Sequence, residues 1–479
     1  MSPLELRPAI ADARAARSRR ALLAGSVGNL VEWYEFGVYG CLVTVIADNF
    51  FATGGPAGGA GALVATYASF ALAFFFRPVG AVLFGRLGDR AGRLPALVAS
   101  VTVMTLATTA IGLLPTRDAI GVAAPVLLTV LRVLQGLSAG GEFGGAVSLM
   151  TEHAPAGRRG LHGAFQSFTV ALGLLAGAGT AAALATVLPA AALYGWGWRI
   201  PFLLALPLGA VALWLRTGVE EPPPPEPAPV PAGAPDRADV MRADGTRGDV
   251  VRTDVVRTDG TRTDGTRTDG TRTDGTRADV VRAVVVRAVV LGIGRVMGWS
   301  AAGYTFLVVL PAHLQAVLGT SVRDALLATA LANLGFAAAI LPAGALSDRI
   351  GRRPVMVFGA LSVVLLALPL LRLLQSPEAG PGAKGGAVLL AGALVGLLAG
   401  PGPAMLAEMF PRRIRCTGLG VAYALANAVF SGCAGLVITA LTARTGSPDV
   451  PAFYAAGVCA VSAAALLTLG GRDHREPLR

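Results

Sequence analysis

The sequence predicts an all-α polytopic membrane protein in which twelve transmembrane helices form two six-helix bundles. Three observations predict this fold class: an apolar composition, twelve apolar segments of membrane-spanning length, and a motif repeated at the same place in each half. Of the 479 residues, 54% are hydrophobic and only 14% are charged. A soluble domain usually carries about 25% charged residues. The composition therefore excludes a soluble enzyme and a largely disordered chain.

The formal net charge of +11 does not change this conclusion. A nucleic-acid binder gathers its basic residues on a folded polar surface, which this apolar chain lacks, so no nucleic-acid partner is expected. No nucleophile–base set or phosphate-binding loop indicates an enzyme. The cysteines and histidines lie singly, so neither a metal site nor a disulfide framework is expected. These residues are Cys41, Cys416, Cys433, Cys459, His153, His162, His313 and His474.

The six spans of the first half are predicted from windows of about 19 residues, the length that crosses ~30 Å of hydrocarbon. They cover residues 22–47, 62–85, 95–114, 121–150, 161–188 and 199–216. The first span is too long for a cleaved signal peptide and contains two glutamates. Small residues at four-residue spacing, as at Gly136, Gly140 and Gly144, allow close helix packing inside a membrane.

A polar interval separates these spans from six more. The second six cover residues 288–318, 325–346, 354–374, 385–409, 416–441 and 451–470. Nineteen basic residues lie on one side of the spans and six on the other, before the long central loop is counted. Because basic residues remain on the cytoplasmic side, both termini are predicted to be cytoplasmic, and the expected location is the cytoplasmic (inner) membrane.

The central loop is the least regular part of the chain. It begins with a proline-rich stretch and continues as an R-T-D-G-T repeat, with arginine at every fifth position from Arg237 to Arg287. A period of five matches neither a helix face nor a strand face, so we expect a disordered cytoplasmic loop. Binding of anionic lipids by its arginines is the alternative. The predicted domains are a cytoplasmic N-terminus (1–21), a first bundle (22–216), this loop (217–287), a second bundle (288–471) and a cytoplasmic tail (472–479).

A motif of glycine, aspartate and arginine occurs between spans 2 and 3 and again between spans 8 and 9. Such a repeat suggests two bundles related by an axis along the membrane normal, with a site between them. Glycine suits a tight turn, and arginine keeps the loop on the cytoplasmic side. We interpret the two loops as a cytoplasmic gate. The residues are Gly85, Asp89, Arg90, Gly92 and Arg93 in the first loop and Asp348, Arg349, Gly351 and Arg352 in the second.

Charged residues inside spans 1 and 4 are candidates for proton coupling. Placing a charge at the centre of a span costs about 2.5 kcal/mol or more, so such residues are functional candidates by default. Glu32 lies on a polar face of span 1 with Glu35 beside it, and Arg132 and Glu142 share a face of span 4. A carboxylate holds a proton in a dry site and releases it beside a cation, so three carboxylates near one arginine suit a proton carrier. The alternative is a fixed ion pair that locks the two helices together.

Other polar and aromatic residues within the spans are candidates for substrate binding. Arg295 in span 7 has two interpretations: it holds a substrate carboxylate, or it extends to the membrane surface. Helix–helix hydrogen bonds explain the asparagines of the second half and Gln166 equally well. The full set is Asn29, Tyr34, Tyr39, Arg77, Gln135, Gln166, Arg295, Trp299, Tyr304, Asn333, Tyr423 and Asn427.

Five segments of this sequence resemble a known family, the metabolite:proton symporters of the major facilitator superfamily. The most specific are residues 28–40 (GNLVEWYEFGVYG) and 132–145 (RVLQGLSAGGEFGG), and residues 76–93, 198–202 and 408–415 support them. The resemblance covers the chain outside residues 226–287. It implies the major facilitator fold and uptake of a small zwitterion or organic acid with a proton, by rocking of two bundles. It also adds Glu408 and Arg415 to the predicted gate.

Three functions remain open at this point. A proton symporter explains the intramembrane carboxylates, the twinned halves and the family segments. A proton-coupled efflux antiporter for drugs or metabolites shares the architecture, and a non-transporting sensor of the same fold would account for the unusual central loop. For the symporter, the expected partners are a small-molecule substrate, protons and the lipid bilayer. A monomer is the expected functional unit, and a proton gradient replaces any cofactor.

Overall fold

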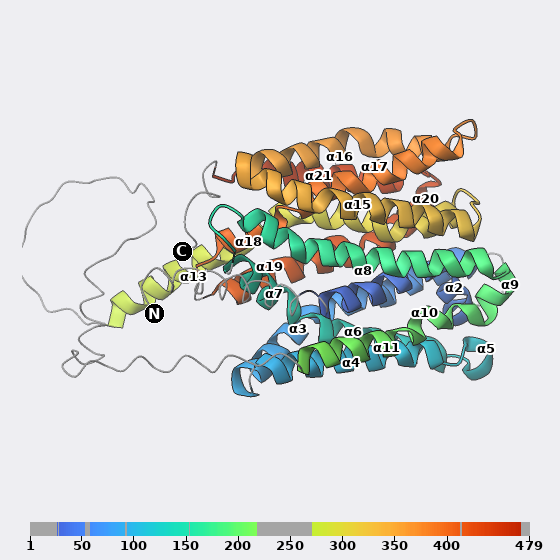
Figure 1. The fold of residues 1–479 in the computed structure, drawn as a ribbon, viewed down its shortest axis with the longest axis horizontal. Coiled ribbons are helices and arrows are strands. Elements are labelled where there is room, and N and C mark those ends of the chain that lie inside the picture. The colour runs from blue at the N-terminus through green and yellow to red at the C-terminus, as the bar shows by residue number, and fades with distance from the viewer. Residues whose placement is uncertain are drawn as a thin grey trace, which may run out of the picture. The chain divides into compact units, whose positions relative to one another are not determined.

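The computed structural model describes residue 26 and residues 28–52, 58–91, 93–152, 154–217, 271–411 and 414–470. All the regular elements in these ranges are helices. Most of the long helices run side by side along the long axis of Figure 1, and the elements of the first half lie on one side of those of the second. The two halves meet where α8 (Arg159–Val187) packs along α15 (Val322–Ile350).

The described helices of the first half correspond to the six predicted spans. Span 1 is a bent pair in which Gly28–Cys41 and Val43–Phe51 differ in direction by 65°. Span 4 is interrupted at Gly140 and Gly141. In chain order, the remaining elements are α2 (Val43–Ile46), η1 (Ala47–Phe51), α3 (Gly58–Ala91), α4 (Arg93–Leu113), α5 (Arg117–Ile120), α6 (Ala123–Ala139), α7 (Glu142–Glu152), α8, α9 (Ala190–Ala192), η2 (Leu193–Gly197), α10 (Arg199–Leu203) and α11 (Ala205–Thr217).

The second half repeats this pattern of spans. The η elements are short π-helical turns, which often occur at functional sites. Two of them lie at predicted site residues: η3 directly follows Tyr304, and η4 begins at Asn427. The elements are α13 (Thr271–Tyr304), η3 (Thr305–Val309), α14 (Leu310–Ala316), α15, α16 (Arg352–Gln375), α17 (Pro381–Ala399), α18 (Gly402–Met409), α19 (Arg415–Ala426), η4 (Asn427–Gly432), α20 (Ala434–Thr445) and α21 (Val450–Leu466).

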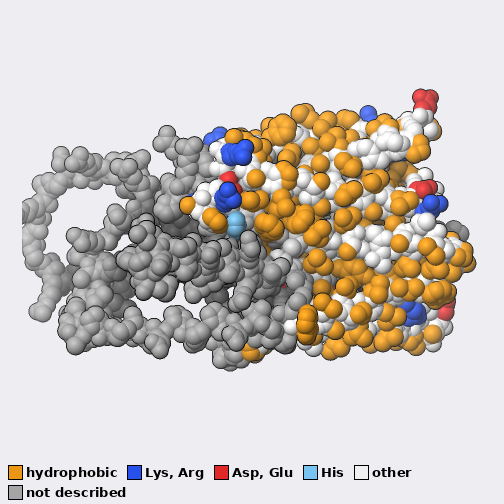
Figure 2. All heavy atoms as spheres, in the orientation of Figure 1, with side chains coloured by type: hydrophobic (Ala, Val, Ile, Leu, Met, Phe, Trp, Pro, Cys, Tyr) orange, Lys and Arg blue, Asp and Glu red, His pale blue; other side chains and the backbone are white. Residues whose placement is uncertain are grey.

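The surface of the described helices is that of a membrane protein. Nine helices are long and apolar enough to cross a membrane, the bent pair makes a tenth, and Val98–Leu113 and Val450–Leu466 are shorter apolar helices. Large apolar side chains face outward, including Val187, Trp214 and Leu365 at 80%, 72% and 72% exposure. Figure 2 shows hydrophobic side chains covering the middle of the visible face, with most of the charged ones near its ends. All twelve predicted spans therefore have a helical counterpart.

Three sequence-based boundaries differ from those of the structure. Both glycine–aspartate–arginine loops were predicted as turns, but α3 continues to Ala91 and α15 to Ile350. In the second loop only Gly351 separates two helices, and its φ of 99° lies in the region that favours glycine. In addition, α13 begins at Thr271, within the loop predicted to be disordered up to residue 287. The earlier part of that loop lies outside the described residues, as do both termini.

Glycines set the spacing between α3 and α6. A Cβ atom at Gly136 would overlap the backbone of Ala73, and one at Gly140 would overlap the backbone of Arg77. The third predicted contact glycine, Gly144, faces the backbone of Cys416 in the other half. The close approach places Arg77 of α3 and Arg132 of α6 among the same group of aromatic rings.

We expect Gly136→Val to destabilise the folded protein, because α3 and α6 must move apart to accept the side chain. Overpacking of this kind typically costs about 1–3 kcal/mol. The matched control is Gly179→Val in α8, where an added Cβ meets nothing within 4 Å. Thermal unfolding of the purified protein should show a Tm lower by a few degrees for Gly136→Val only. Equal Tm values for the two variants would contradict the packing described for these helices.

Candidate functional site

Glu32 and Arg77 form a buried ion pair between helix Gly28–Cys41 and α3. The distance between Glu32 Oε1 and Arg77 Nη2 is 3.1 Å, and both side chains are almost fully buried. The Arg77 guanidinium also lies over the rings of Phe36 and Phe74, 4.6 and 4.3 Å from their centroids. Sequence reasoning assigned Arg77 to substrate binding and expected the carboxylates around Arg132. That expectation is wrong for Glu32, whose ion-pair partner is Arg77.

Arg132 reaches the second carboxylate, Glu35, through two intervening side chains. Arg132 Nη1 donates a hydrogen bond to Oε1 of Gln135 at 2.6 Å, and Nε2 of Gln135 donates to Oγ1 of Thr108 at 2.5 Å. The Thr108 hydroxyl in turn donates to Glu35 Oε2 at 2.6 Å. Glu35 Oε1 has no hydrogen-bond partner among the described residues, and the side chain is buried. Two carboxylates of one helix therefore have different surroundings, one beside a cation and one beside a neutral hydroxyl.

Aromatic rings surround both arginines. The Arg132 guanidinium lies 4.1 Å from the Tyr39 ring centroid and 4.8 Å from that of Phe70. The Tyr39 hydroxyl and Ser69 Oγ are 2.8 Å apart. Tyr304 of α13 lies edge-on to Phe74 with their centroids 5.4 Å apart, so the second half contributes to the same cluster. A guanidinium over aromatic faces is stabilised even where water is excluded.

Rings also close the space between the halves next to this cluster. Phe143 of α7 and Tyr423 of α19 are stacked, with 3.5 Å between their centroids and an interplanar angle of 5°. Trp299 of α13 packs against Tyr423 at 5.6 Å. The cavities here are small: one of about 10 Å³ is lined by Glu32, Arg77, Phe143 and Tyr423, and another of about 10 Å³ by Glu32 and Glu142. Each is the size of a single water, so the cluster is closed to an organic solute in this conformation.

The polar residues of the second half are bonded mainly within that half. Asn427 donates to the Tyr423 carbonyl at 3.0 Å and accepts from Ser431 Oγ at 2.8 Å. Asn333 donates to the carbonyls of Thr329 and Leu307 at 3.0 and 3.3 Å. Asn427, Tyr304 and Trp299 line a cavity of about 30 Å³ together with Trp33 of the first half.

Some predicted substrate residues lie elsewhere. The Tyr34 hydroxyl donates to the Pro201 carbonyl at 2.9 Å, between helix Gly28–Cys41 and α10. Arg295 Nη2 donates to Thr468 Oγ1 at 2.8 Å, so this arginine lies against the end of α21. Asn29 lines one of the two cavities of about 10 Å³, but its amide also donates to α8, at Thr169 Oγ1 (2.7 Å) and at the Gln166 carbonyl (3.1 Å). These contacts favour a packing role over direct contact with a solute.

An ionic network joins the two halves at the arginine-rich end of the helices. The carboxylate of Asp348 accepts hydrogen bonds from the backbone N–H groups of Gly160 and Leu161, at 2.7 and 2.9 Å, at the N-terminus of α8. A helix N-terminus favours such a negative charge. Arg352 donates to Asp348 at 2.8 Å and to both carboxylate oxygens of Glu408, at 2.9 and 3.3 Å. Four residues of the predicted gate thus lie in or beside one network.

Arg415, the fourth of these residues, completes the connection between the halves. Its Nη1 donates to Glu152 of α7 at 2.6 Å, and Arg159 lies 3.6 Å from Glu408. Sequence reasoning missed Glu152 as a partner and counted Arg159 only as an orientation signal. Arg349 is exposed, and Gly351 forms the turn between α15 and α16. Gly85 lies within α3, whereas Gly92 and the side chains of Asp89, Arg90 and Arg93 lie outside the described part of the chain.

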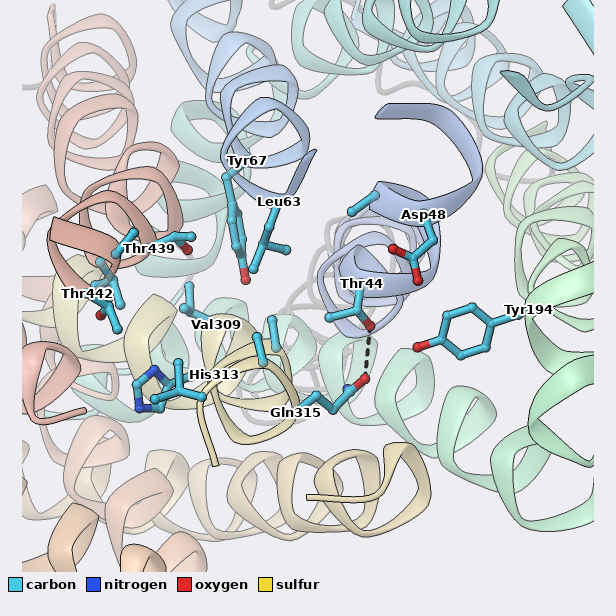
Figure 3. A pocket seen from close by; sticks show the side chains of 16 residues that line it. Thr44, Asp48, Leu63, Tyr67, Tyr194, Val309, His313, Gln315, Thr439 and Thr442 are labelled. Atoms are coloured by element: carbon cyan, nitrogen blue, oxygen red, sulfur yellow. Dashed lines mark hydrogen bonds between the residues drawn. The ribbon is translucent and has the colours of Figure 1, made fainter. Parts of the chain in front are cut away.

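A cavity of about 480 Å³ opens at the opposite end of the helices and is lined by both halves. We call it the vestibule, and Figure 3 shows the side chains that line it. None of the residues that line the vestibule was predicted from the sequence. Asp48 and His313 carried the available signal, since one is a charge beside an apolar span and the other is a histidine within one. No group of three or more His, Cys, Asp or Glu residues that could hold a metal ion occurs in the described parts of the chain.

Two family profiles match this chain. One is described as "Sugar (and other) transporter" and matches residues 21–224, and the other, "Major Facilitator Superfamily", matches residues 289–479. Among solved structures, a partially occluded inward-open structure of the xylose transporter XylE from E. coli aligns with a TM-score of 0.67 and 19% identity. It covers 94% of this chain and 97% of XylE. At that identity the likeness shows the fold alone.

Curated relatives are more similar in sequence. The ectoine/proline transporter ProP of Corynebacterium glutamicum is 33% identical over 458 residues, covering 94% of this chain and 83% of the relative. The proline/betaine transporter of Escherichia coli (strain K12) is 30% identical over 436 residues, covering 91% and 80%. The alpha-ketoglutarate permease of the same strain is 32% identical over 428 residues, covering 88% and 87%.

We expect Arg352→Gln to loosen the ionic network, because it removes the cation that bridges Asp348 and Glu408. Separation of the halves at this end would expose Ser167 of α8, which is fully buried and whose hydroxyl donates to the Ala399 carbonyl of the second half at 2.8 Å. In a Ser167→Cys background, alkylation of this cysteine by N-ethylmaleimide, followed by mass spectrometry, should then be several-fold faster with Arg352→Gln than without it.

The control is Arg349→Gln, an equal change of charge at an exposed residue three positions away. Both variants should elute as single monodisperse species. Equal alkylation rates for the two variants would show that the network does not hold this end closed.

Proposed function

This chain belongs to the major facilitator superfamily, among its metabolite:proton symporters, and we propose that it takes up a small zwitterionic osmolyte or organic acid together with a proton. It is a multi-pass membrane transporter of a small molecule and not an enzyme. By their names, the curated relatives described above transport ectoine, proline, betaine and alpha-ketoglutarate, and these solutes are zwitterions or an organic acid.

The observation that carries the proposal is the contrast between Glu32 and Glu35. Glu32 lies beside Arg77, which favours the ionised carboxylate, whereas Glu35 contacts the neutral hydroxyl of Thr108 in a buried site. When two nearby carboxylates lie in contrasting environments, one keeps its charge and the other takes up and releases a proton. We propose that Glu35 carries the proton. The hydrogen bonds through Thr108 and Gln135 link the protonation of Glu35 to Arg132, a cation near the interface between the halves.

Glu142 has a supporting place in this proposal. It lines the same water-sized cavity as Glu32, where α7 begins next to the break in span 4. A water in that cavity would connect the two carboxylates, so Glu142 is the candidate for passing a proton towards the arginine-rich end. The proposal therefore uses all four proton-coupling candidates predicted from the sequence, Glu32, Glu35, Arg132 and Glu142, and gives each a distinct role.

The gate and the vestibule support alternating access. In this conformation the ionic network closes the arginine-rich end while the vestibule opens at the other. The excess of arginine assigns the closed end to the cytoplasm, so we propose an outward-facing state with cytoplasmic termini in the cytoplasmic membrane. Rocking of the halves would break the network and admit the solute to the cell. The lipid bilayer and the proton gradient suffice for this cycle, with a monomer as the working unit and no cofactor.

Two other functions use the same architecture, and proteoliposome transport separates them. Under an inward proton gradient, a symporter accumulates labelled glycine betaine, proline or alpha-ketoglutarate, and an uncoupler abolishes this accumulation. Accumulation driven instead by an outward proton gradient would favour an efflux antiporter. Absence of flux for every solute of a broad panel would favour a sensor.

We predict that Glu35→Gln abolishes accumulation driven by the proton gradient but preserves exchange of labelled for unlabelled solute. The glutamine retains the contact with Thr108 but cannot gain or lose a proton. The matched control is Glu378→Gln, the same substitution in an exposed loop, and it should transport like the wild type. If Glu35→Gln accumulates solute at the wild-type level, Glu35 does not carry the proton.

A further inference from the structure

The vestibule has the size of a ligand site and belongs to both halves. Its volume of about 480 Å³ falls in the range of small-molecule pockets, roughly 300–1,000 Å³, whereas the deeper cavities admit only one or two waters. Thr44 of the first half donates to Gln315 Oε1 of the second at 3.0 Å, and both residues line the cavity. Figure 3 places the Tyr194 hydroxyl beside this bond. A solute bound here would therefore contact both halves.

One carboxylate sets the charge of the vestibule. Among the described residues that line it, Asp48 is the only aspartate, glutamate, lysine or arginine, and it is exposed to the cavity. The rings of Tyr67 and Tyr194 stand on either side of the same space. A carboxylate together with electron-rich aromatic faces attracts ammonium groups, including quaternary ones that cannot donate a hydrogen bond.

Three buried polar atoms of the same cavity lack a protein partner. The Tyr67 hydroxyl, Gln315 Nε2 and Thr442 Oγ1 have no hydrogen-bond partner among the described residues. An unsatisfied buried polar group costs about 1–3 kcal/mol, so three in one cavity indicate a surface shaped for a polar ligand or for water. Each can donate a hydrogen bond. Gln315 lies beside Thr44, one helical turn from Asp48, whereas Figure 3 places Tyr67 and Thr442 across the cavity from Asp48, where they offer donors to a carboxylate.

From these features we propose that the vestibule is an outer recognition site for zwitterions, and that it selects them over dicarboxylates. The ammonium group of the solute lies by Asp48 and the Tyr194 ring, and its carboxylate accepts from Tyr67 and Thr442. A dicarboxylate would set a second negative charge against Asp48, which disfavours its binding. The inference deepens the proposed function, since it names the class of solute that enters the pathway.

Equilibrium binding tests the site without any proton gradient. Labelled glycine betaine is titrated onto purified full-length protein, with proline and alpha-ketoglutarate as competitors. Proline should compete and alpha-ketoglutarate should not. Asp48→Asn should weaken glycine betaine binding about tenfold, as expected for the loss of one contact with a charged group. Tyr67→Phe, which keeps the ring and removes the donor, should weaken it by a smaller factor.

The matched control is Asp118→Asn, the same change of charge at an exposed aspartate of α5 that does not line the vestibule. It should bind like the wild type. Wild-type affinity in Asp48→Asn, competition by alpha-ketoglutarate equal to that by proline, or no binding of glycine betaine to the wild type would each overturn the proposal. Binding that depends on Asp48 in a protein without gradient-driven uptake would support this site and refute proton symport instead.

Discussion

The cost of placing charge inside an apolar helix bundle is the constraint on which this structure depends. Arg77 borders a cavity of about 10 Å³, the size of one water, and Arg132 is fully buried, so the protein must supply the surroundings of both arginines. It does so with one carboxylate, one glutamine and a set of aromatic faces. Removing one partner of a buried ion pair typically costs about 3–5 kcal/mol. The arrangement is therefore stable only while each charge keeps its partner, which makes it sensitive to protonation.

The same principle operates at the two ends of the helices with opposite results. At the arginine-rich end, Arg159 and Arg415 pair with carboxylates across the boundary between the halves, at Glu408 and Glu152, so charge pairing holds that end closed. At the other end, Asp48 remains exposed in an open cavity, and three polar atoms of that cavity have no hydrogen-bond partner in the described part of the chain. A protein that closes one end by its own ion pairs and leaves the other end to be completed by a solute has the elements of alternating access. Transporters with two rocking halves require such elements.

The fold followed from the sequence more completely than the site did. Apolar length identifies spans, and a charge within a span is conspicuous, so Glu32, Glu35, Arg132 and Glu142 were visible as candidates. Their partners were not, because pairing between helices depends on rotation and tilt that composition does not encode. Thr108 links Glu35 to Gln135 but resembles any other threonine in an apolar span. Asp48 lies one residue beyond the predicted end of span 1, where a polar residue is ordinary, and the 65° bend that turns this segment towards the vestibule leaves no clear sequence signal.

The central claim is that solute movement carries protons through this bundle. The most direct measurement is the internal pH of proteoliposomes, followed with an enclosed dye while glycine betaine is added outside in the absence of any imposed gradient. The account predicts internal acidification that begins with the solute and is absent in Glu35→Gln. Entry of labelled glycine betaine with no change in internal pH would contradict it.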